Sequence, residues 1–204
     1  MEPAVLVVGS AVLESAAVTF RFMLAFVFLA AALPKLVGRR EFEQAVRNYR
    51  VVPSSLVPVV AAWLPRLELA CAVALFGGIF LRPVAVALSV LLVCFAGAVA
   101  VNLARGRRFD CGCQVSVAPR QIDWGVVVVD LALAGLAATV AVAAPRVFAV
   151  DAFRAGESQS ITTGDAVALL FVAGALFLVY QLLEAVIAAR GTAASAHLME
   201  ASGR

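Results

Sequence analysis

The stretch VAVALSVLLVCFAGAVAVNL, residues 84–103, contains no charged side chain in 20 positions. An α-helix rises about 1.5 Å per residue, so a run of this length can cross the roughly 30 Å hydrocarbon core of a bilayer. The chain as a whole has the same character, with 204 residues, 64% of them hydrophobic and 14% charged, and a mean hydropathy of +1.02. Soluble domains carry about 25% charged residues. This composition indicates an integral membrane protein.

Other apolar runs lie before and after this stretch. They cover residues 18–37, 56–80, 124–144 and 166–189. Between the first two, residues 39–53 are charged and amphipathic, with Phe42, Val46 and Tyr49 at helical spacing, which predicts a short helix lying at the membrane interface. We therefore expect an all-α helical bundle with about five transmembrane helices and one short interfacial helix after the first.

Two features bear on the connections between these spans. Pro65 predicts a kink or interruption in the second span, because proline removes a helix hydrogen bond and clashes with the preceding turn. Arg82 and Pro83 predict the tightest connection in the chain, and residues 145–164 predict a polar loop. The sequence has no internal repeat, so we expect a single transmembrane domain over residues 1–204.

The basic residues predict how the chain is oriented in the cell membrane. One group follows the first and third spans: Arg39, Arg40, Arg47, Arg50, Arg105, Arg107, Arg108 and Arg120. The opposite side carries only Arg82, Arg146 and Arg154. The positive-inside rule then places the N-terminus outside and the segment after the third span in the cytoplasm. The net charge of +3 fits contact with membrane lipid, and we find no nucleic-acid motif.

Two of the four cysteines, Cys111 and Cys113, flank Gly112 in that segment. Glycine makes a disulfide around one residue feasible, because it adopts backbone angles that other residues avoid. A strained, exposed bridge is labile, so this spacing favours thiol–disulfide exchange over a structural cross-link. The nearby Arg107 would favour the thiolate, the reactive form.

Two other interpretations of the cysteine pair remain open. Two thiolates can also bind a soft metal ion such as Cu(I) or Zn, although two sulfur ligands do not complete a tetrahedral site and His197 is the only histidine. The pair can equally be two inert thiols. The sequence predicts no firm cofactor, and a quinone or a soft metal stays an open alternative.

Cys71 and Cys94 suggest a second dithiol. Cys71 lies 11 residues before Arg82 and Cys94 lies 12 residues after it, so an antiparallel helix pair would bring them to similar depths. They would then relay electrons across the membrane. The simpler interpretation is that each is a small buried hydrophobic residue.

Charged residues inside the spans are candidates for function, because burying them in lipid is costly. Glu68 lies three residues before Cys71 and so on the same helix face, where it is either a proton acceptor beside the thiol or one half of an ion pair with Arg21 or Arg66. Asp130, about two turns into its span, either faces a polar pocket beneath the cysteine segment or stabilises a helix contact.

Several short motifs, taken in order, resemble one family. They are residues 28–36 (FLAAALPKL), Phe42, Tyr49 and Pro53, residues 64–68 (LPRLE), residues 102–106 (NLARG) and residues 111–113 (CGC). This pattern resembles the MauE family of methylamine utilisation clusters, which is related to DoxX-like membrane proteins. The resemblance covers residues 18–144, which leaves the span at 166–189 as an additional C-terminal helix.

The resemblance implies a multi-pass membrane protein that works with a thioredoxin-like protein in disulfide formation during maturation of an exported enzyme. It makes Cys111 and Cys113 the redox pair, surrounded by the polar set Lys35, Tyr49, Glu68, Asn102 and Arg105. One cysteine would attack a disulfide of the partner and the other would resolve the mixed disulfide, with Arg105 or Arg107 holding the thiolate.

We therefore expect a membrane-embedded thiol–disulfide oxidoreductase or electron conduit, with a thioredoxin-fold protein as partner and other membrane proteins as candidates for a complex. Two alternatives belong to other classes. One is a membrane protein that handles Cu or Zn through Cys111 and Cys113. The other is a non-catalytic assembly or scaffold subunit whose cysteines are incidental.

Overall fold

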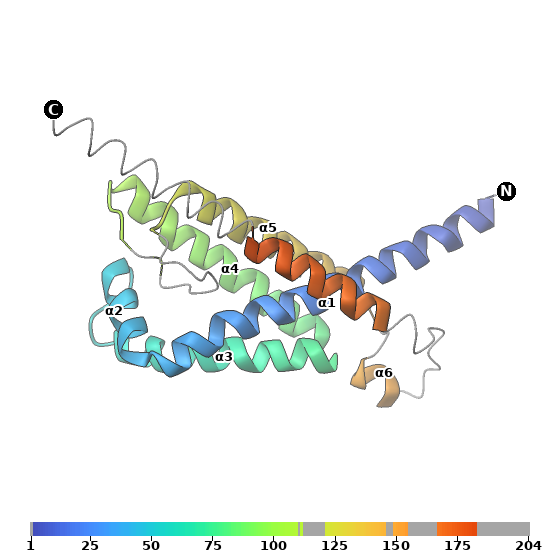
Figure 1. Cartoon of the computed structure of the whole chain (residues 1–204), viewed down its shortest axis with the longest axis horizontal. Helices are drawn as coiled ribbons and strands as arrows, with labels where there is room; N and C mark the ends of the chain where they lie inside the picture. Colours follow the sequence, from blue (N-terminus) through green and yellow to red (C-terminus); the bar gives the residue numbers. More distant parts are fainter. Residues whose placement is uncertain (1, 110, 112–120, 146–148, 155–166, 183–204) are drawn as a thin grey trace.

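The structure of the chain is a computed structural model that describes residues 2–109, 111, 121–145, 149–154 and 167–182. Its helices are α1 (Glu2–Val37), α2 (Arg39–Tyr49), α3 (Val57–Gly77), α4 (Leu81–Ala104), α5 (Trp124–Ala143) and α6 (Val150–Arg154), followed by an apolar helix at Val167–Leu182. No β-strand occurs within the described ranges. The all-α prediction is confirmed, and Figure 1 shows the helices gathered into one bundle.

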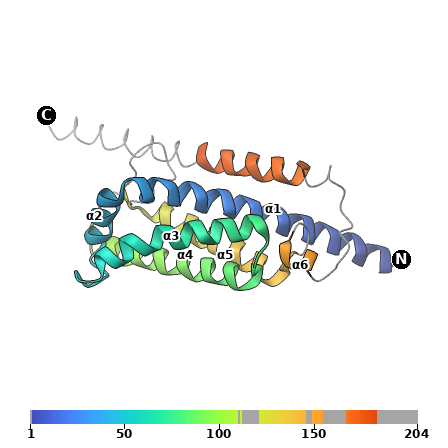
Figure 2. The same cartoon turned by 90° about the horizontal axis from the view of Figure 1, so that it is seen from below.

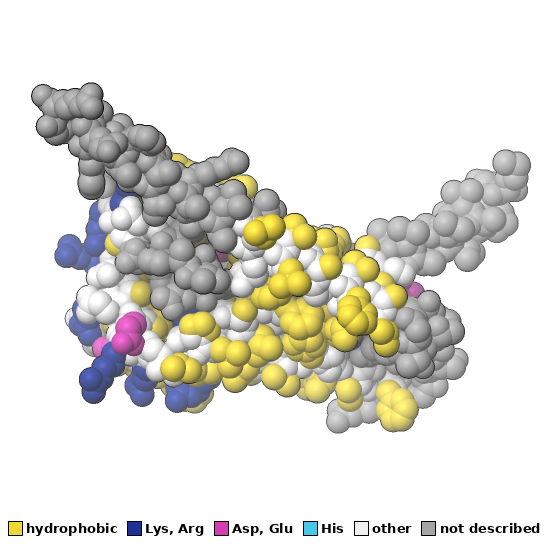
Figure 3. Space-filling model, in the orientation of Figure 1, with side chains coloured by type: hydrophobic (Ala, Val, Ile, Leu, Met, Phe, Trp, Pro, Cys, Tyr) yellow, Lys and Arg dark blue, Asp and Glu magenta, His cyan; other side chains and the backbone are white. Residues whose placement is uncertain are grey.

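Within the described residues, four helices are long and apolar enough to span a membrane. These segments are Glu14–Val37, Val57–Gly77, Leu81–Ala104 and Trp124–Ala143. The helix Val167–Leu182 is apolar but shorter, and the remainder of the predicted fifth span, up to residue 189, lies outside the described residues. Figure 3 shows hydrophobic side chains over the middle of the molecule and Lys and Arg side chains at the α2 end. The protein is a multi-pass membrane helical bundle.

The helices pack around a core of aliphatic and small residues. The most extensive contact joins α4 to α5, and α1 packs against both α3 and α5. The fully buried side chains of this core include Leu24, Leu75, Leu88, Ala137 and Val140. The helix Val167–Leu182 runs alongside α1 (Figure 2), where Phe177 lies 5.8 Å from Phe26 between ring centroids.

Helix α2 lies across the end of the bundle where α1 ends and α3 begins (Figure 1). Its apolar residues Phe42, Val46 and Tyr49 are buried, and the first two form a cluster with Val57 and Ala61 of α3. The helix ends at Tyr49, and Arg50 follows in the left-handed conformation with φ 48°. The predicted short helix is therefore present, and its apolar face is covered by the bundle.

The structure has no interruption at Pro65, and the predicted tight connection lies a few residues before Arg82. Helix α3 continues through Pro65, which is fully buried, because neighbouring helices in a membrane bundle can accommodate an interior proline. The tight turn between α3 and α4 lies at Gly78 and Phe80, both with positive φ, and Arg82 already belongs to α4. A Cβ atom on Gly78 would lie 2.5 Å from the Cα atom of Ala149, so glycine permits this close approach.

Candidate functional site

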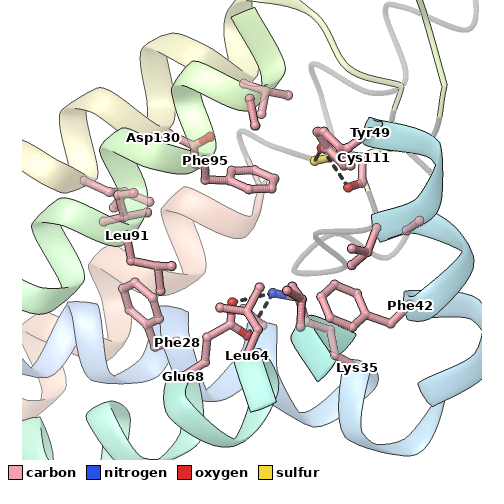
Figure 4. A pocket seen from close by; sticks show the side chains of 18 of the residues that line it. Phe28, Lys35, Phe42, Tyr49, Leu64, Glu68, Leu91, Phe95, Cys111 and Asp130 are labelled. Carbon is pink, nitrogen blue, oxygen red and sulfur yellow. Dashed lines mark hydrogen bonds and ion pairs between the residues drawn. The ribbon is translucent and has the colours of Figure 1, made fainter. Parts of the chain in front are cut away.

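A cavity of about 200 Å³ lies at the α2 end of the bundle, between α2 and the helices α1, α3, α4 and α5. Most of its lining is aliphatic or aromatic, with a few polar side chains. The residues labelled in Figure 4 are Phe28, Lys35, Phe42, Tyr49, Leu64, Glu68, Leu91, Phe95, Cys111 and Asp130. The cavity thus brings together polar residues that lie far apart in the sequence.

Lys35 of α1 and Glu68 of α3 form a buried ion pair in the cavity wall. The Lys35 ammonium donates to both carboxylate oxygens of Glu68, at 2.6 and 2.8 Å, and the two side chains are 6% and 8% exposed. The ammonium also lies 5.3 Å from the centre of the Phe42 ring. Because burying one charge alone is costly, each charge requires the other, and the pair joins α1 to α3.

The predicted ion partners of Glu68 were wrong. Arg66 points to the surface and donates to the carbonyl of Ala62 on its own helix. Arg21 is fully buried, with its guanidinium 4.5 Å from the centre of the Phe22 ring and close to the α3–α4 turn at Gly78. The carboxylate of Glu68 instead faces α1, where Lys35 is the cation within reach.

The end of α2 holds Cys111. The Tyr49 hydroxyl donates a hydrogen bond to the Cys111 carbonyl at 3.0 Å and contacts its Sγ atom at 3.6 Å. Tyr49 also packs edge-on against Phe109, with ring centroids 4.9 Å apart, and against Phe95 at 5.7 Å. Cys111 is buried among these rings and lines the cavity, as the upper right of Figure 4 shows.

Asn102 and Arg107 fix the end of α2 against the end of α4. The fully buried Asn102 donates from Nδ2 to the carbonyl of Tyr49 at 2.9 Å. Arg107 donates to Oδ1 of Asn102 at 2.8 Å and to the carbonyl of Asn48 at 2.9 Å. A cation at a helix C-terminus also interacts favourably with the helix dipole. These bonds set the position of Tyr49, and through it the position of Cys111.

The ends of the segment that contains the cysteine pair are held together. The amide of Ile122 donates to the carbonyl of Phe109 at 2.9 Å. One residue later, the Asp123 side chain caps α5 by accepting from the amide of Val126 at 2.9 Å. Ile122 is fully buried in the same cluster as Cys111 and Tyr49. Gly112 and Cys113 lie outside the described residues.

The other predicted polar residues fall in two environments. Arg105 is the C-cap residue of α4 and is exposed to solvent. Asp130 of α5 is buried and lines the cavity, on the side of the cavity opposite Tyr49 and Cys111 in Figure 4. Arg107, rather than Arg105, therefore takes part in the hydrogen bonds that link α2 and α4.

Cys71 and Cys94 face different surroundings. Cys71 is buried in the core, whereas Cys94 is exposed on the outer face of α4. They form no disulfide with each other. Helix α4 packs mainly against α5, so Cys94 is directed away from the interior that surrounds Cys71. This arrangement gives the proposed relay no structural support.

No group of three or more His, Cys, Asp or Glu side chains that could hold a metal ion occurs within the described part of the chain. His197, like Cys113, lies outside that part.

Sequence reasoning offered an ion pair for Glu68 but did not identify Lys35 as its partner, and it did not identify the link from Asn102 to Tyr49. The only sequence signal for the ion pair was the presence of two opposite charges in otherwise apolar spans, where an unpaired charge is unfavourable. Tyr49 and Asn102 are 53 residues apart, and no local pattern connects them.

Comparisons with known proteins agree with this architecture. The model of the family "Methylamine utilisation protein MauE" matches residues 13–143. The chain is 38% identical to the MauE protein of Paracoccus denitrificans over 157 residues, covering 76% of this chain and 83% of the relative. It is 37% identical to that of Paracoccus versutus over 161 residues, covering 78% and 81%.

A third relative, the MauE protein of Methylophilus methylotrophus, is 41% identical over 119 residues, which cover 57% of this chain and 63% of the relative. No solved structure matches the chain. The family model covers α2, α3, α4 and α5 and most of α1, and these helices form the cavity together with Tyr180 from the helix Val167–Leu182. By this match, and by the identity to its relatives, the chain belongs to the MauE family of membrane proteins.

Proposed function

We propose that the protein takes part in methylamine utilisation as a membrane-embedded thiol–disulfide exchange protein, with Cys111 and Cys113 as its redox pair and a thioredoxin-fold protein as its partner. The observation that carries the proposal is the placement of Cys111. Its sulfur lies beside the Tyr49 hydroxyl, at the boundary between a membrane bundle and the short segment that contains Cys113.

The exchange proceeds through a mixed disulfide. A thiolate of the reduced pair attacks a disulfide of the partner, forming one S–S bond and breaking another, which releases a partner thiolate. The second cysteine of the pair then attacks the mixed disulfide. The products are a Cys111–Cys113 disulfide and a reduced partner, so two electrons pass from one dithiol to the other. The same intermediate serves the reverse direction, and the relative reduction potentials decide which direction dominates.

Three features of the site support this chemistry. The Tyr49 hydroxyl is a hydrogen-bond donor beside the sulfur, and donors stabilise negative charge on a thiolate. The Arg107 guanidinium lies 5.4 Å from the centre of the Phe109 ring, which packs against Tyr49. The Phe109–Ile122 hydrogen bond fixes the base of the segment, so the sulfur of Cys111 keeps its place while the partner docks.

For the orientation in the cell membrane, we propose that the α2 end faces the cytoplasm. The exposed arginines of α2 and the exposed Arg105 and Arg108 lie at this one end, where Figure 3 shows the basic side chains. The positive-inside rule places such an end on the cytoplasmic side. Labelling of a single added cysteine at Glu41 with a membrane-impermeant reagent in intact cells tests the orientation, since rapid labelling there would place α2 outside.

The exchange is tested on the full-length protein in detergent. A redox titration with a mass-tagged alkylating reagent follows the oxidation of the thiols in the wild type and in Cys111→Ser, Cys113→Ser and Cys94→Ser. We expect a reversible two-electron transition that disappears in the first two variants and persists in Cys94→Ser, the matched control with an exposed cysteine. Thiols that stay reduced across the physiological range would overturn the proposal.

The partner class is tested by trapping. A thioredoxin whose second active-site cysteine is replaced by serine cannot resolve a mixed disulfide, so it should remain attached to the oxidised protein through Cys111 or Cys113. Mass spectrometry of the cross-linked peptide identifies the cysteine. Attachment at Cys94 alone, or none at all, would contradict a specific exchange.

A further inference from the structure

We propose that the cavity beside Cys111 binds the single-ring headgroup of a neutral, lipid-soluble quinone, the two-electron acceptor for the redox pair. This inference rests on the proposed function taken in the reverse direction, in which the partner dithiol reduces the Cys111–Cys113 disulfide. It adds the oxidant that restores this disulfide. The quinone would accept two electrons and two protons from the dithiol, becoming a hydroquinone as the disulfide forms.

The size of the cavity selects a small ring. A protein cavity of about 150 Å³ holds benzene, and sites for larger drug-like ligands measure about 300 Å³ or more. The 200 Å³ here lies between these values and so suits one substituted ring. Phe28, Phe42, Phe95 and Tyr49 line the cavity with aromatic rings, which favour packing against a flat ligand.

The charges in the wall select a neutral ligand. Glu68 neutralises Lys35 at a distance of 2.6 Å, and Asp130 contributes a second carboxyl group to the wall. An anionic headgroup would therefore lie beside two carboxyl groups and a cation that is already paired. The paired Lys35 and Glu68 side chains offer a cationic ligand no net attraction, because the ammonium offsets the carboxylate. The apolar remainder of the wall favours a ligand with few polar atoms.

The hydrogen-bond donors of the cavity wall lie in two places, which suits a ring that carries one carbonyl oxygen at each end. Lys35 has three N–H donors, and two of these donate to Glu68, which leaves one for a ligand carbonyl as far as the described residues show. On another side of the cavity lies Cys111, whose thiol is a weak S–H donor, beside the Tyr49 hydroxyl that already donates to the Cys111 carbonyl (Figure 4). A quinone carries two carbonyl acceptors separated by its ring, and it would reach both places from within the cavity.

The cavity also extends into the membrane part of the bundle. Its lining includes Leu91 of α4, Val129 of α5 and Tyr180 of the helix Val167–Leu182, all within apolar helices. A ligand dissolved in the lipid is therefore a better match than a water-soluble one, because the hydrophobic tail of such a ligand can remain among the helices.

Binding is measured without electron transfer, on the full-length Cys111→Ser/Cys113→Ser protein in lipid nanodiscs. The probe is a benzoquinone with a short alkyl tail and a photoreactive azido group on the ring. We expect saturable labelling of peptides from α1, α2, α3 or α4 that line the cavity, suppressed by an excess of the unlabelled quinone. Unsaturable labelling spread over lipid-facing helices would show partition into the bilayer and would overturn the proposal.

Two variants fill the cavity, each with a control on the same helix. Ala98→Phe and Ala45→Phe place a ring into the space, whereas Ala87→Phe on α4 and Gln44→Phe on α2 place one on an exposed surface. We expect the dissociation constant for the probe to rise by about tenfold or more in a filled variant that folds, and to stay within about twofold in its control. Equal affinities in a filled variant and its control would overturn the proposal.

The same preparations separate this inference from the proposed function. Wild-type protein is assayed for exchange with the thioredoxin-fold partner, and for reduction of the quinone by its loss of ultraviolet absorbance. Exchange without quinone binding leaves the proposed function standing and removes the quinone. Quinone binding without exchange identifies a ligand site and removes the redox pair as its electron donor, which also overturns the proposal as stated.

Discussion

At the α2 end of the bundle, side-chain hydrogen bonds and an ion pair join elements that are distant in the sequence: Lys35 with Glu68, Asn102 with Tyr49, and Tyr49 with Cys111. At the opposite end, α3 turns into α4 through Gly78 and Phe80, and the backbone at Gly78 packs directly on Ala149. The first end contains a cavity and chemically active groups, whereas the second is closed by backbone contact. The difference shows that the ion pair and the hydrogen bonds named here gather around the cavity and the Cys111 thiol.

Breaking the ion pair should have the largest effect. Lys35→Met leaves the Glu68 carboxylate buried without its cation, which we expect to cost about 3–5 kcal/mol in the free energy of unfolding. Unfolding in detergent by increasing sodium dodecyl sulfate, followed by circular dichroism, measures the loss. The double variant Lys35→Met/Glu68→Leu should recover most of it. A double variant as unstable as the single one would show that the charge itself is not the cause.

The closed end should be next in sensitivity. Gly78→Ala forces a left-handed alanine and brings its Cβ against Ala149, so we expect about 2 kcal/mol of destabilisation in the same assay. Gly106 has a similar φ of 68° but nothing within 4 Å of the added Cβ. Gly106→Ala therefore reports the backbone strain alone, about 1 kcal/mol. Equal losses in the two variants would mean that the contact with Ala149 contributes nothing.

Removing the amide at Asn102 should have a smaller effect on stability and a specific effect on the thiol. Asn102→Leu leaves the carbonyl of Tyr49 and the guanidinium of Arg107 without this partner, which we expect to cost about 1–2 kcal/mol. Because the bond positions Tyr49, the rate of thiol alkylation at Cys111 should also change. Ser89→Ala, which removes a hydrogen bond to the carbonyl of Ala134 within the apolar bundle, is the control. An unchanged alkylation rate in Asn102→Leu would contradict the idea that Asn102 influences the Cys111 thiol through Tyr49.

The smallest effect is expected for the surface pair at the α2 end. Glu43 and Arg47 form an exposed ion pair at 3.0 Å with a spacing of four residues, so Glu43→Gln should cost less than about 0.5 kcal/mol. This loss should shrink further at high salt. A loss comparable to that of Lys35→Met would mean that burial does not distinguish the two pairs.

Most helix bounds could be predicted closely from the sequence because uninterrupted apolar runs are long and sharply bounded, although α1 begins at Glu2, well before the predicted residue 18. The predicted span 124–144 corresponds to α5 at Trp124–Ala143, and the span 84–103 lies within α4 at Leu81–Ala104. Helix α2 was predicted from the spacing of Phe42, Val46 and Tyr49, which are indeed its buried residues. Such features depend on local pattern alone.

The pairing at the site could not be predicted in the same way. Which cation meets Glu68 depends on how α1 and α3 are rotated about their axes, and an apolar helix surrounded by apolar residues carries little signal of its rotation. The sequence therefore suggested Arg21 or Arg66 as the partner of Glu68, whereas the structure pairs it with Lys35. The cavity is lined by residues from six helices, so no single segment of the sequence predicts it.

The Phe109–Ile122 hydrogen bond has a consequence for evolutionary change. Since it fixes both ends of the segment between these residues, the bundle does not depend on how many residues lie between them. Doubling the length of a loop closed in this way costs only about 0.6 kcal/mol in chain entropy. Insertions and deletions beyond Cys113 are thus expected to cost little stability, so the length of this segment can vary while the helices stay the same.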